Sequence, residues 1–420
     1  MAFMDTSSVQ NVWPPEPGTS WANLFTFGKV EMKSRVMLQV DDRQLVEEEW
    51  EVPPVGAKEA LLKVEACGMC GSDLEQYRGT FVANKITRYP FIPGHEPIGR
   101  IMEIGAEAAK SWGVKVGDRV ALEPNLSCGR CDLCLRGRYT NCRSLMPPGA
   151  PPAYGFTPTD VGHGFWGAYS DYMHLHERTL LYKLPESMPI SLASLYQPLA
   201  AGISWAVQVP QTQLGDSVLI LGHGQRGLGA VIAARRAGAS LIIVTGTSRS
   251  RTKLQVALAL GAHHVIESDV ENVAERVMQI TGGRGVDVIL DVVPVSTQPI
   301  VDAVEVARVG ATIVLSGIKG PIGVSLNVDR IIYKELIIKG VYSQGNKAYR
   351  EAFRILDEGP QGLDLLHTHE FELSDAVDAI LTLGKEKQSP VDPICITLHP
   401  DVATMSKGKS GPVLGTPRQT

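Results

Sequence analysis

The stretch VLILGHGQRGLGAVIAARRA, residues 218–237, decides the class of fold. Its first four residues predict a short buried strand, and the apolar residues after the glycines recur at helical spacing. A G-x-G-x-x-G pattern lies between the strand and the helix. Its glycines are Gly222, Gly224 and Gly227, and the two residues before the last glycine are Gln225 and Arg226. All five are candidate cofactor-binding residues. In this context the pattern predicts a loop that binds the pyrophosphate of a dinucleotide at a helix N-terminus. A glycine-rich turn that binds nothing is the alternative.

Apolar runs alternate with helical patterns on both sides of this loop. Strands are predicted at 218–221, 241–245, 264–266, 286–292, 311–316 and 336–341. Helices are predicted at 227–237, 251–260, 270–281 and 297–309. Buried runs of Val, Ile and Leu that alternate with helices indicate a parallel sheet covered on both faces. Six strands fit a complete doubly wound dinucleotide-binding domain, which we expect to span residues 201–344.

The rest of the chain has a different texture. Residues 36–200 are rich in Gly, Pro and short β-like runs, such as 59–64, 98–104 and 119–122, which predict a β-rich domain. A helix at 348–358 and a β-rich piece follow the dinucleotide domain. We expect residues 345–420 to return to the first domain, which spans residues 1–200. The first 30 residues and the tail from about 400 read as irregular.

Composition excludes several classes of function. Forty Lys and Arg against 45 Asp and Glu give a net charge of −5, so no basic excess indicates nucleic acid or an anionic membrane as a partner. No apolar run approaches the ~18–20 residues of a membrane span. The N-terminus lacks a basic start followed by an apolar run, so no signal peptide is predicted. The expectation is a cytoplasmic protein.

Four of the seven cysteines lie within fifteen residues, in the spacing C-x2-C-x2-C-x7-C. They are Cys128, Cys131, Cys134 and Cys142. Four thiolates on one short loop suit a closed tetrahedral zinc site, which leaves no position for water and is therefore structural. An iron–sulfur cluster is the chemical alternative, and four unligated cysteines are the other.

A second candidate metal site lies upstream of these cysteines. Cys70-Gly-Ser72-Asp73 and Gly-His95-Glu96 supply a thiolate, an imidazole and carboxylates. A catalytic zinc takes three such ligands and keeps a fourth position for water or substrate. A single cysteine is more often a core residue and a single histidine more often a core or surface residue than a metal ligand. The occurrence of both motifs in one chain favours a metal site.

Taken together, these motifs resemble the zinc-dependent medium-chain dehydrogenase/reductases, the alcohol and polyol dehydrogenases, over residues 35–400. The resemblance implies a GroES-like catalytic domain interrupted by a Rossmann domain, with one catalytic and one structural zinc, and a homodimer or homotetramer. It implies that Cys70 and His95 bind the catalytic zinc, with a third ligand from Glu96 or from residues near 197. Ser72 matches the hydroxyl that passes the proton, and Asp73 matches a carboxylate that orients the histidine. The resemblance also implies that residues at the ends of two predicted strands, 286–292 and 311–316, contact the nicotinamide. Among them are Val293, Ser316 and Gly317.

The sequence departs from the family pattern in two places. Where the polyol branch has Glu-Pro-Leu, this chain has Gln197-Pro-Leu, and a neutral amide is a poor zinc ligand. We therefore expect Glu96 to carry more of the coordination and Gln197 to hydrogen-bond a bound water. Glu75 occupies the place of a histidine that often relays the proton, so the relay is expected to use ribose hydroxyls and solvent.

The substrate signals are weaker than the metal motifs. Tyr154, Phe156, Phe165 and Trp166 lie in a loop that the resemblance places near the substrate cleft, which suggests an apolar or aromatic alcohol or ketone. Packing of this loop on its own domain or on a second subunit is the alternative.

The cofactor preference depends on the residues that follow the second predicted strand. An NAD-selective site places Asp or Glu about 20 residues beyond the glycine turn. This chain has Thr247, Ser248, Arg249 and Arg251 there, and no acidic residue between Asp216 and Glu267. Arginine and hydroxyl groups suit a 2′-phosphate, so NADP(H) is expected over NAD(H). Solvated arginines with bound NAD are the alternative.

Two other functions stay open at this stage. A zinc-free quinone or enoyl reductase of the same superfamily would lack both metal sites. A non-catalytic zinc-bearing binding module would keep the scaffold without turnover.

Overall fold

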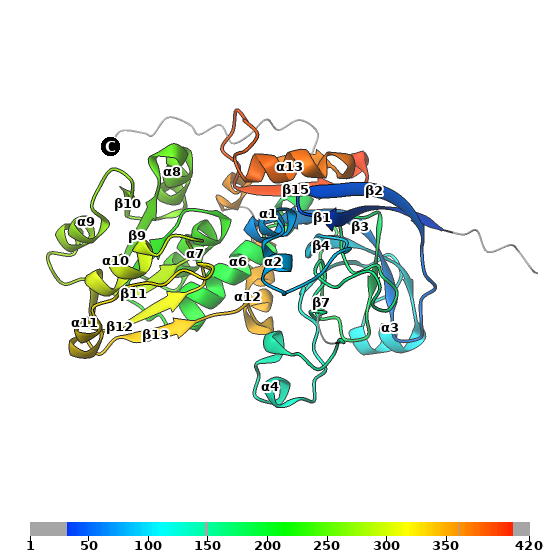
Figure 1. Cartoon of the computed structure of the whole chain (residues 1–420), viewed down its shortest axis with the longest axis horizontal. Coiled ribbons are helices and arrows are strands. Elements are labelled where there is room, and N and C mark those ends of the chain that lie inside the picture. The colour runs from blue at the N-terminus through cyan, green and yellow to red at the C-terminus, as the bar shows by residue number, and fades with distance from the viewer. Residues whose placement is uncertain (1–31, 148–149, 360, 406–420) are drawn as a thin grey trace, which may run out of the picture.

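The computed structural model describes residues 32–147, 150–359 and 361–405. Two large sheets stand side by side, one in each half of the molecule, with helices α6 and α12 between them (Figure 1). The arm expected over the first 30 residues and most of the expected tail lie outside the described residues.

The six-stranded sheet is the parallel sheet that the sequence predicts. Its strands are β8 (Ser217–Leu221), β9 (Leu241–Gly246), β10 (His264–Glu267), β11 (Val286–Asp291), β12 (Ala307–Leu315) and β13 (Ile337–Gly340). All neighbours are parallel, in the order β10-β9-β8-β11-β12-β13, and Ile220 of β8 pairs with Val244 and Leu290 on either side. This is the strand order of a doubly wound dinucleotide-binding domain, so the predicted fold class is confirmed.

Helices cover both faces of this sheet, which is why its strands are continuous apolar runs. They are α7 (Gln225–Arg236), α8 (Arg251–Leu260), α9 (Val273–Ile280), α10 (Gln298–Val306) and α11 (Val328–Tyr333). Helix α9 begins later than predicted because the Asn272 side chain accepts a hydrogen bond from the Glu275 N–H and caps it. Helix α10 ends earlier than predicted because β12 already begins at Ala307.

The other half holds a hairpin and a seven-stranded sheet. The hairpin is β1 (Lys33–Asp41) and β2 (Gln44–Glu51). The sheet runs β14-β15-β3-β4-β5-β7, with β6 also on β3. Its strands are β3 (Ala60–Met69), β4 (Glu96–Ile104), β5 (Arg119–Leu122), β6 (Tyr172–Leu175), β7 (Leu181–Lys183), β14 (His367–Glu372) and β15 (Cys395–His399). Because β15 pairs with β3, the chain beyond α12 completes the sheet that the N-terminal half began (Figure 1).

Short helices connect these strands and join the two halves. They are α1 (Gly71–Tyr77), α2 (Thr80–Ala83), α3 (Ala106–Trp112), α4 (Asp132–Leu135), α5 (Ile190–Ala193), α6 (Tyr196–Ile203), α12 (Asn346–Asp357) and α13 (Ala376–Leu383). Helix α6 crosses α7 where Gly202 meets Gly229, so closely that a Cβ on Gly202 would lie 2.3 Å from the Gly229 carbonyl carbon.

One helical run, Ile190–Gln208, is long and apolar enough to cross a membrane, although the sequence suggested no such run. It packs inside the protein, where 83% of its apolar window is buried. Its composition therefore reflects a core helix.

Candidate active site and metal centres

Helix α1 positions the first part of the site. It begins directly after Cys70, and the Asp73 carboxylate accepts a 2.8 Å hydrogen bond from the Cys70 N–H, which closes a capping box at the helix start. The Tyr169 hydroxyl donates to the other Asp73 oxygen across 3.1 Å. Both ends of the Asp73 carboxylate are thus held in place.

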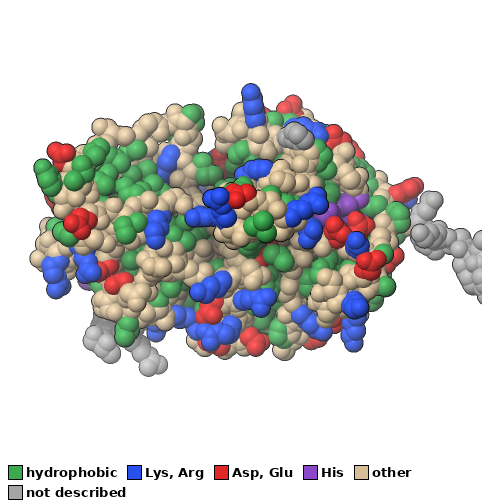
Figure 2. All heavy atoms as spheres, turned by 90° about the horizontal axis from the view of Figure 1, so that it is seen from below, with side chains coloured by type: hydrophobic (Ala, Val, Ile, Leu, Met, Phe, Trp, Pro, Cys, Tyr) green, Lys and Arg blue, Asp and Glu red, His purple; other side chains and the backbone are tan. Residues whose placement is uncertain are grey.

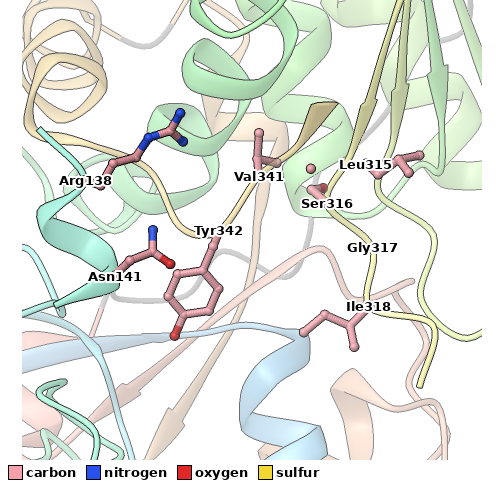
Figure 3. A pocket seen from close by; sticks show the side chains of 9 residues that line it. Arg138, Asn141, Leu315, Ser316, Gly317, Ile318, Val341 and Tyr342 are labelled. Atoms are coloured by element: carbon pink, nitrogen blue, oxygen red, sulfur yellow. The ribbon is translucent and has the colours of Figure 1, made fainter. Parts of the chain in front are cut away.

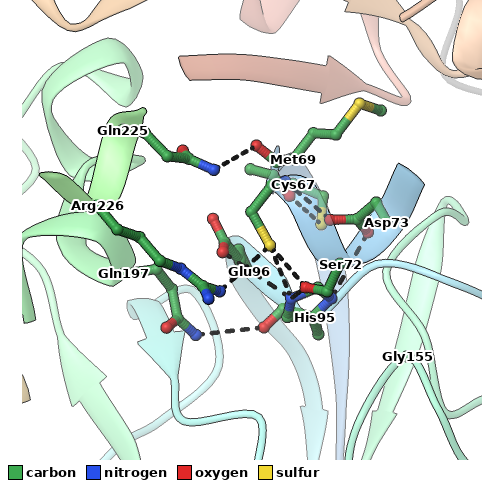
Figure 4. Close-up of polar contacts among 12 residues, drawn as sticks. Cys67, Met69, Ser72, Asp73, His95, Glu96, Gly155, Gln197, Gln225 and Arg226 are labelled. Atoms are coloured by element: carbon green, nitrogen blue, oxygen red, sulfur yellow. Dashed lines mark hydrogen bonds and ion pairs between the residues drawn. The ribbon is translucent and has the colours of Figure 1, made fainter. Parts of the chain in front are cut away.

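The predicted ligands of the open metal site meet where β3 ends and β4 begins (Figure 4). Cys70 Sγ lies 3.3 Å from His95 Nε2, which lies 3.9 Å from Glu96 Oε1. A tetrahedral zinc with bonds of about 2.0–2.3 Å would separate its ligand atoms by roughly 3.3–3.8 Å. The separation of Cys70 Sγ and His95 Nε2 fits two ligands of one zinc ion, and that of His95 Nε2 and Glu96 Oε1 is slightly longer than this range.

The charges of the site also fit a cation. Burial raises the pKa of both the Cys70 thiol and the Glu96 carboxyl, because neither anion is solvated there. A divalent cation between them would remove that penalty. Cys70, Asp73 and His95 offer ligand atoms within 4.8 Å of one another, but Asp73 Oδ1 lies 3.5 Å from His95 Nδ1, the nitrogen remote from Cys70. This is the geometry of a carboxylate that orients a metal-binding histidine.

Ser72 lies on the open side of the same cluster. Its Oγ is 2.8 Å from Cys70 Sγ and 3.2 Å from His95 Nε2. A hydroxyl this close to two metal ligands is within reach of a substrate oxygen at the free coordination position. Glu75 faces elsewhere, accepting hydrogen bonds from Arg78 and Thr80.

Gln197 lies beside the metal site with its amide engaged by protein groups. Its Oε1 accepts hydrogen bonds from Gln344 Nε2 and, across 2.8 Å, from the Tyr349 hydroxyl. Its Nε2 lies 3.5 Å from the carbonyl oxygen of His95 (Figure 4). An amide oxygen with two donors has no lone pair left for a metal or a water. Gln197 Oε1 is therefore not available as a zinc ligand, and the expectation that the Gln197 amide hydrogen-bonds a bound water stays a prediction, as does the role of Glu96 as the third ligand.

One of the four aromatic residues in the predicted substrate loop reaches the site. The Phe156 ring centroid lies 5.2 Å from that of His95 and 5.6 Å from that of Phe81, a residue that the sequence did not single out. The other three are buried in the core of the catalytic half: Tyr154, Phe165 and Trp166. For these three the alternative interpretation holds, because the loop packs on its own domain.

The four-cysteine lobe around α4 protrudes from the catalytic half (Figure 1). Its sulfur atoms lie 3.5 Å apart for Cys131 and Cys134, 3.9 Å for Cys128 and Cys134, and 4.0 Å for Cys131 and Cys142. Tetrahedral zinc with Zn–S near 2.3 Å requires about 3.8 Å. Backbone N–H groups, first that of Arg130, lower the pKa of Cys128 to about 6, which favours its thiolate. Four sulfur donors fill the coordination sphere, so this site is structural.

The glycine loop has the shape of a phosphate site. Gly222 has φ +111°, and a Cβ on Gly227 would lie 2.0 Å from the Gly222 carbonyl oxygen, so neither position admits a side chain without strain. Gly224, at the N-cap of α7, has no atom within 4 Å of the place of its missing Cβ. That open space lies where a pyrophosphate would accept hydrogen bonds from the helix N-terminus.

The loops after β11 and β12 converge beside this turn. Val293 contacts Gly317 so closely that a Cβ on Gly317 would lie 2.2 Å from the Val293 carbonyl oxygen. Ser316 and Gly317 line a cavity of about 400 Å³ (Figure 3). Its opposite wall is formed by Tyr342 and by Arg138 and Asn141 of the cysteine lobe, residues that the sequence did not indicate.

A carboxylate that no sequence pattern indicated lies beside the end of β9. Asp269, which follows β10, accepts 2.7 Å hydrogen bonds from the N–H and the hydroxyl of Ser248. Among the described residues, the Arg249 guanidinium makes no hydrogen bond or ion pair, although its charge helps to lower the pKa of Asp269, whereas Arg251 is paired with Glu267 at 2.6 Å. Asp269 is 21 residues beyond Ser248 in the chain and lies beside it because β10 pairs with β9.

Comparison with known proteins identifies the family. The model of the alcohol dehydrogenase GroES-like domain matches residues 56–186, and that of the zinc-binding dehydrogenases matches residues 227–358. A probable alcohol dehydrogenase of Mycobacterium tuberculosis is 35% identical over 370 residues, which cover 87% of this chain and 98% of that protein. The chain belongs to the zinc-containing alcohol dehydrogenase family.

Other relatives agree with this assignment. The sorbitol dehydrogenase of Bacillus subtilis is 33% identical over 351 residues, 83% of this chain and 92% of that enzyme. The alcohol dehydrogenase structure of Thermotoga maritima superposes with a TM-score of 0.78 at 25% identity, covering 88% of this chain and all of that one. An alcohol dehydrogenase of E. coli CFT073, solved with NADH, gives 0.74 at 26% identity, covering 87% and 99%.

The protein is thus a zinc-containing, NAD(P)-dependent enzyme of the alcohol dehydrogenase type. The zinc-free reductase is excluded as an alternative, because the ligands of a catalytic and of a structural zinc site are both assembled.

Proposed function

We propose that this dehydrogenase oxidises alcohols with an apolar or aromatic body, or reduces the corresponding ketones and aldehydes, and prefers NADP(H). The observation that carries the substrate class is the pair of rings, Phe156 and Phe81, beside His95. Aromatic walls exclude water and favour an apolar substrate at the reacting centre.

A substrate panel tests this class. Aromatic and branched apolar alcohols should give higher kcat/KM than sorbitol or threonine with the same cofactor. The reverse order would overturn the substrate class. Absence of turnover on the whole panel, in protein that binds zinc and cofactor, would favour the non-catalytic binding module.

The chain's own residues prepare the reaction. Cys70, His95 and Glu96 would hold the zinc, and the Asp73 carboxylate, 3.5 Å from His95 Nδ1, would orient the His95 ring. When bound, zinc polarises the substrate oxygen and the nicotinamide accepts or gives the hydride. Ser72 accepts the hydroxyl proton and passes it toward the ribose hydroxyls and solvent. The rings of Phe81 and Phe156 keep bulk water from the reacting carbon.

The cofactor preference rests on a comparison of Arg249 with Asp269. Asp269 would disfavour a 2′-phosphate, but both its oxygens already accept hydrogen bonds from Ser248. The Arg249 guanidinium, unpaired within the described part of the chain, offers charge-assisted hydrogen bonds to a phosphate. The hydrogen bonds from Ser248 lower the pKa of Asp269 and leave its negative charge in place, so the preference depends on the Arg249 charge being the stronger of the two at the 2′-phosphate.

Arg249→Ala is expected to lower kcat/KM for NADP roughly 10- to 100-fold, the scale of losing hydrogen bonds to a charged group. The value for NAD should change less than about twofold. Arg251→Ala removes a neighbouring arginine that is already paired with Glu267, and it serves as the matched control. A higher kcat/KM with NAD in the unmodified enzyme, together with an equal effect of Arg249→Ala on both cofactors, would refute the preference.

We further propose that two copies associate through β13 and α11. Strand β13 pairs only with β12 among the described strands, so its other edge is open, and Ile337 and Ile338 on it are exposed. Viewed from below, apolar side chains gather over this end of the molecule (Figure 2). Exposed apolar residues nearby are Val309, Val328, Ile332 and Tyr333. An open edge with an apolar patch favours pairing with another strand, here that of a second copy.

Ile338→Lys is expected to halve the mass measured by light scattering, because a charge on the edge strand opposes strand pairing. Val116→Lys places the same charge at an exposed apolar residue of the other half and should leave the mass unchanged. If Ile338→Lys keeps the mass of the unmodified protein, the interface lies elsewhere.

A cytoplasmic location completes the proposal. None of the seven cysteines, all of which lie in the described part of the chain, forms a disulfide, and four of them form one metal-ligand cluster, which suits a reducing compartment.

A further inference from the structure

The side chains of two neighbouring residues of the glycine loop, both predicted from the sequence to bind the cofactor, contact the metal site. Gln225 Nε2 donates to the carbonyl oxygen of Met69 across 3.2 Å. Arg226 Nη2 donates to Cys70 Sγ across 3.4 Å (Figure 4). The cofactor loop of one half of the molecule therefore touches the segment that carries the zinc cysteine of the other half.

The Arg226 guanidinium is held in place by an aromatic ring. Its central carbon lies 5.4 Å from the centroid of the Trp205 ring, within cation–π distance. Trp205 is itself fixed, because it is buried and its Nε1 donates to the Ser343 carbonyl across 3.0 Å. A planar cation stacked in this way loses little freedom when it donates a hydrogen bond.

The side chains around this contact leave the guanidinium facing the metal ligands. Cys70 and Glu96 are both buried, and Arg226 Nη2 reaches the sulfur of the first of them. Gln197, which stands where the polyol pattern has a glutamate, is neutral and turned toward Gln344 and Tyr349. Arg226 therefore meets the Cys70 thiolate with no carboxylate from position 197 to compete for it.

We propose that Arg226 is a positioning residue of the catalytic zinc site, which holds the Cys70 thiolate by a hydrogen bond from the cofactor-binding loop. Because Arg226 belongs to the glycine loop, this hydrogen bond couples the position of the Cys70 sulfur to the position of the loop that binds the cofactor. This role does not depend on the substrate class or the NADP preference proposed above.

A hydrogen bond to a metal thiolate has a spectroscopic signature. The donor withdraws electron density from sulfur and lowers the energy of its lone pairs. In protein with cobalt(II) in the Cys70 site and zinc in the cysteine lobe, the thiolate-to-cobalt charge-transfer band then lies at higher energy than it would without the donor. Metal analysis giving one cobalt and one zinc per chain verifies the sample.

Arg226→Met is expected to move this band to lower energy and to lower kcat about tenfold, the scale of one hydrogen bond to a charged group. Arg226→Lys keeps a cationic donor and should return both band and kcat part of the way. Arg236→Met removes an exposed arginine of the same helix, paired with Glu358, and should change neither. This variant controls for the loss of one charge from α7.

An unmoved band in Arg226→Met protein that holds cobalt would overturn the proposal, even if its turnover fell. If that variant does not fold, Arg226→Lys decides on its own. The lysine of Arg226→Lys would make a longer and less directional contact with Cys70 Sγ, so its charge-transfer band should lie at lower energy than that of the unmodified protein. An unchanged band in Arg226→Lys would contradict a hydrogen bond to sulfur. A shift of the same size in Arg236→Met would also overturn the proposal, since it would show a general charge effect.

Discussion

Replacing Cys70 by serine is expected to abolish turnover while the protein stays folded. Cys70 Sγ stands 3.3 Å from His95 Nε2, and a serine hydroxyl is a far weaker zinc ligand than a thiolate. Losing zinc removes several kcal/mol of charge stabilisation at the substrate oxygen, so kcat should fall roughly 10³-fold or more. Metal analysis should fall from two zinc ions per chain to one.

Two further cysteine variants separate the roles of the two sites. Cys131→Ser should lose the other zinc and lower the midpoint of thermal unfolding by about 5–10 °C, because a structural site supplies folding energy. Cys67→Ala removes a buried thiol three residues before Cys70 and should keep both ions. Fewer than two zinc ions in pure, fully folded unmodified protein would contradict the assignment of both sites.

The sequence predicts the dinucleotide domain well because burial on both faces leaves a simple pattern. The runs at 218–221 and 241–245 match β8 and β9 to within one residue. Short helices of the catalytic half escaped prediction. Helix α1 has seven residues, too few for a periodic pattern, and its start depends on the reciprocal bonds between Cys70 and Asp73.

The residues of the site divide in the same way, into those that a local sequence motif marks and those that only the folded chain brings together. Cys70, His95 and the four cysteines lie in local motifs whose spacing carries chemical meaning. The contacts that the sequence did not show join segments far apart in the chain: Ser248 with Asp269, Gln197 with Gln344, and Cys70 with Arg226. Each depends on how strands or domains pack, and no local pattern encodes such packing.

Replacing Ser72 by alanine is expected to lower kcat roughly 10²-fold or more, the usual scale for losing a positioned acid–base group. The Ser72 hydroxyl lies 2.8 Å from Cys70 Sγ and 3.2 Å from His95 Nε2, beside the position left open for substrate. Without it, the hydroxyl proton must leave through solvent that Phe81 and Phe156 exclude. Zinc content and the dissociation constant of the cofactor should stay unchanged.

Ser72→Thr provides the matched control, because threonine keeps a hydroxyl at the same carbon. Its kcat should stay within a few-fold of the unmodified enzyme if the hydroxyl carries the proton. Near-normal turnover in Ser72→Ala would mean that another group carries the proton. Loss of zinc in Ser72→Ala would instead show that the hydroxyl acts through Cys70 and His95, as a support of the metal site and not as the proton acceptor.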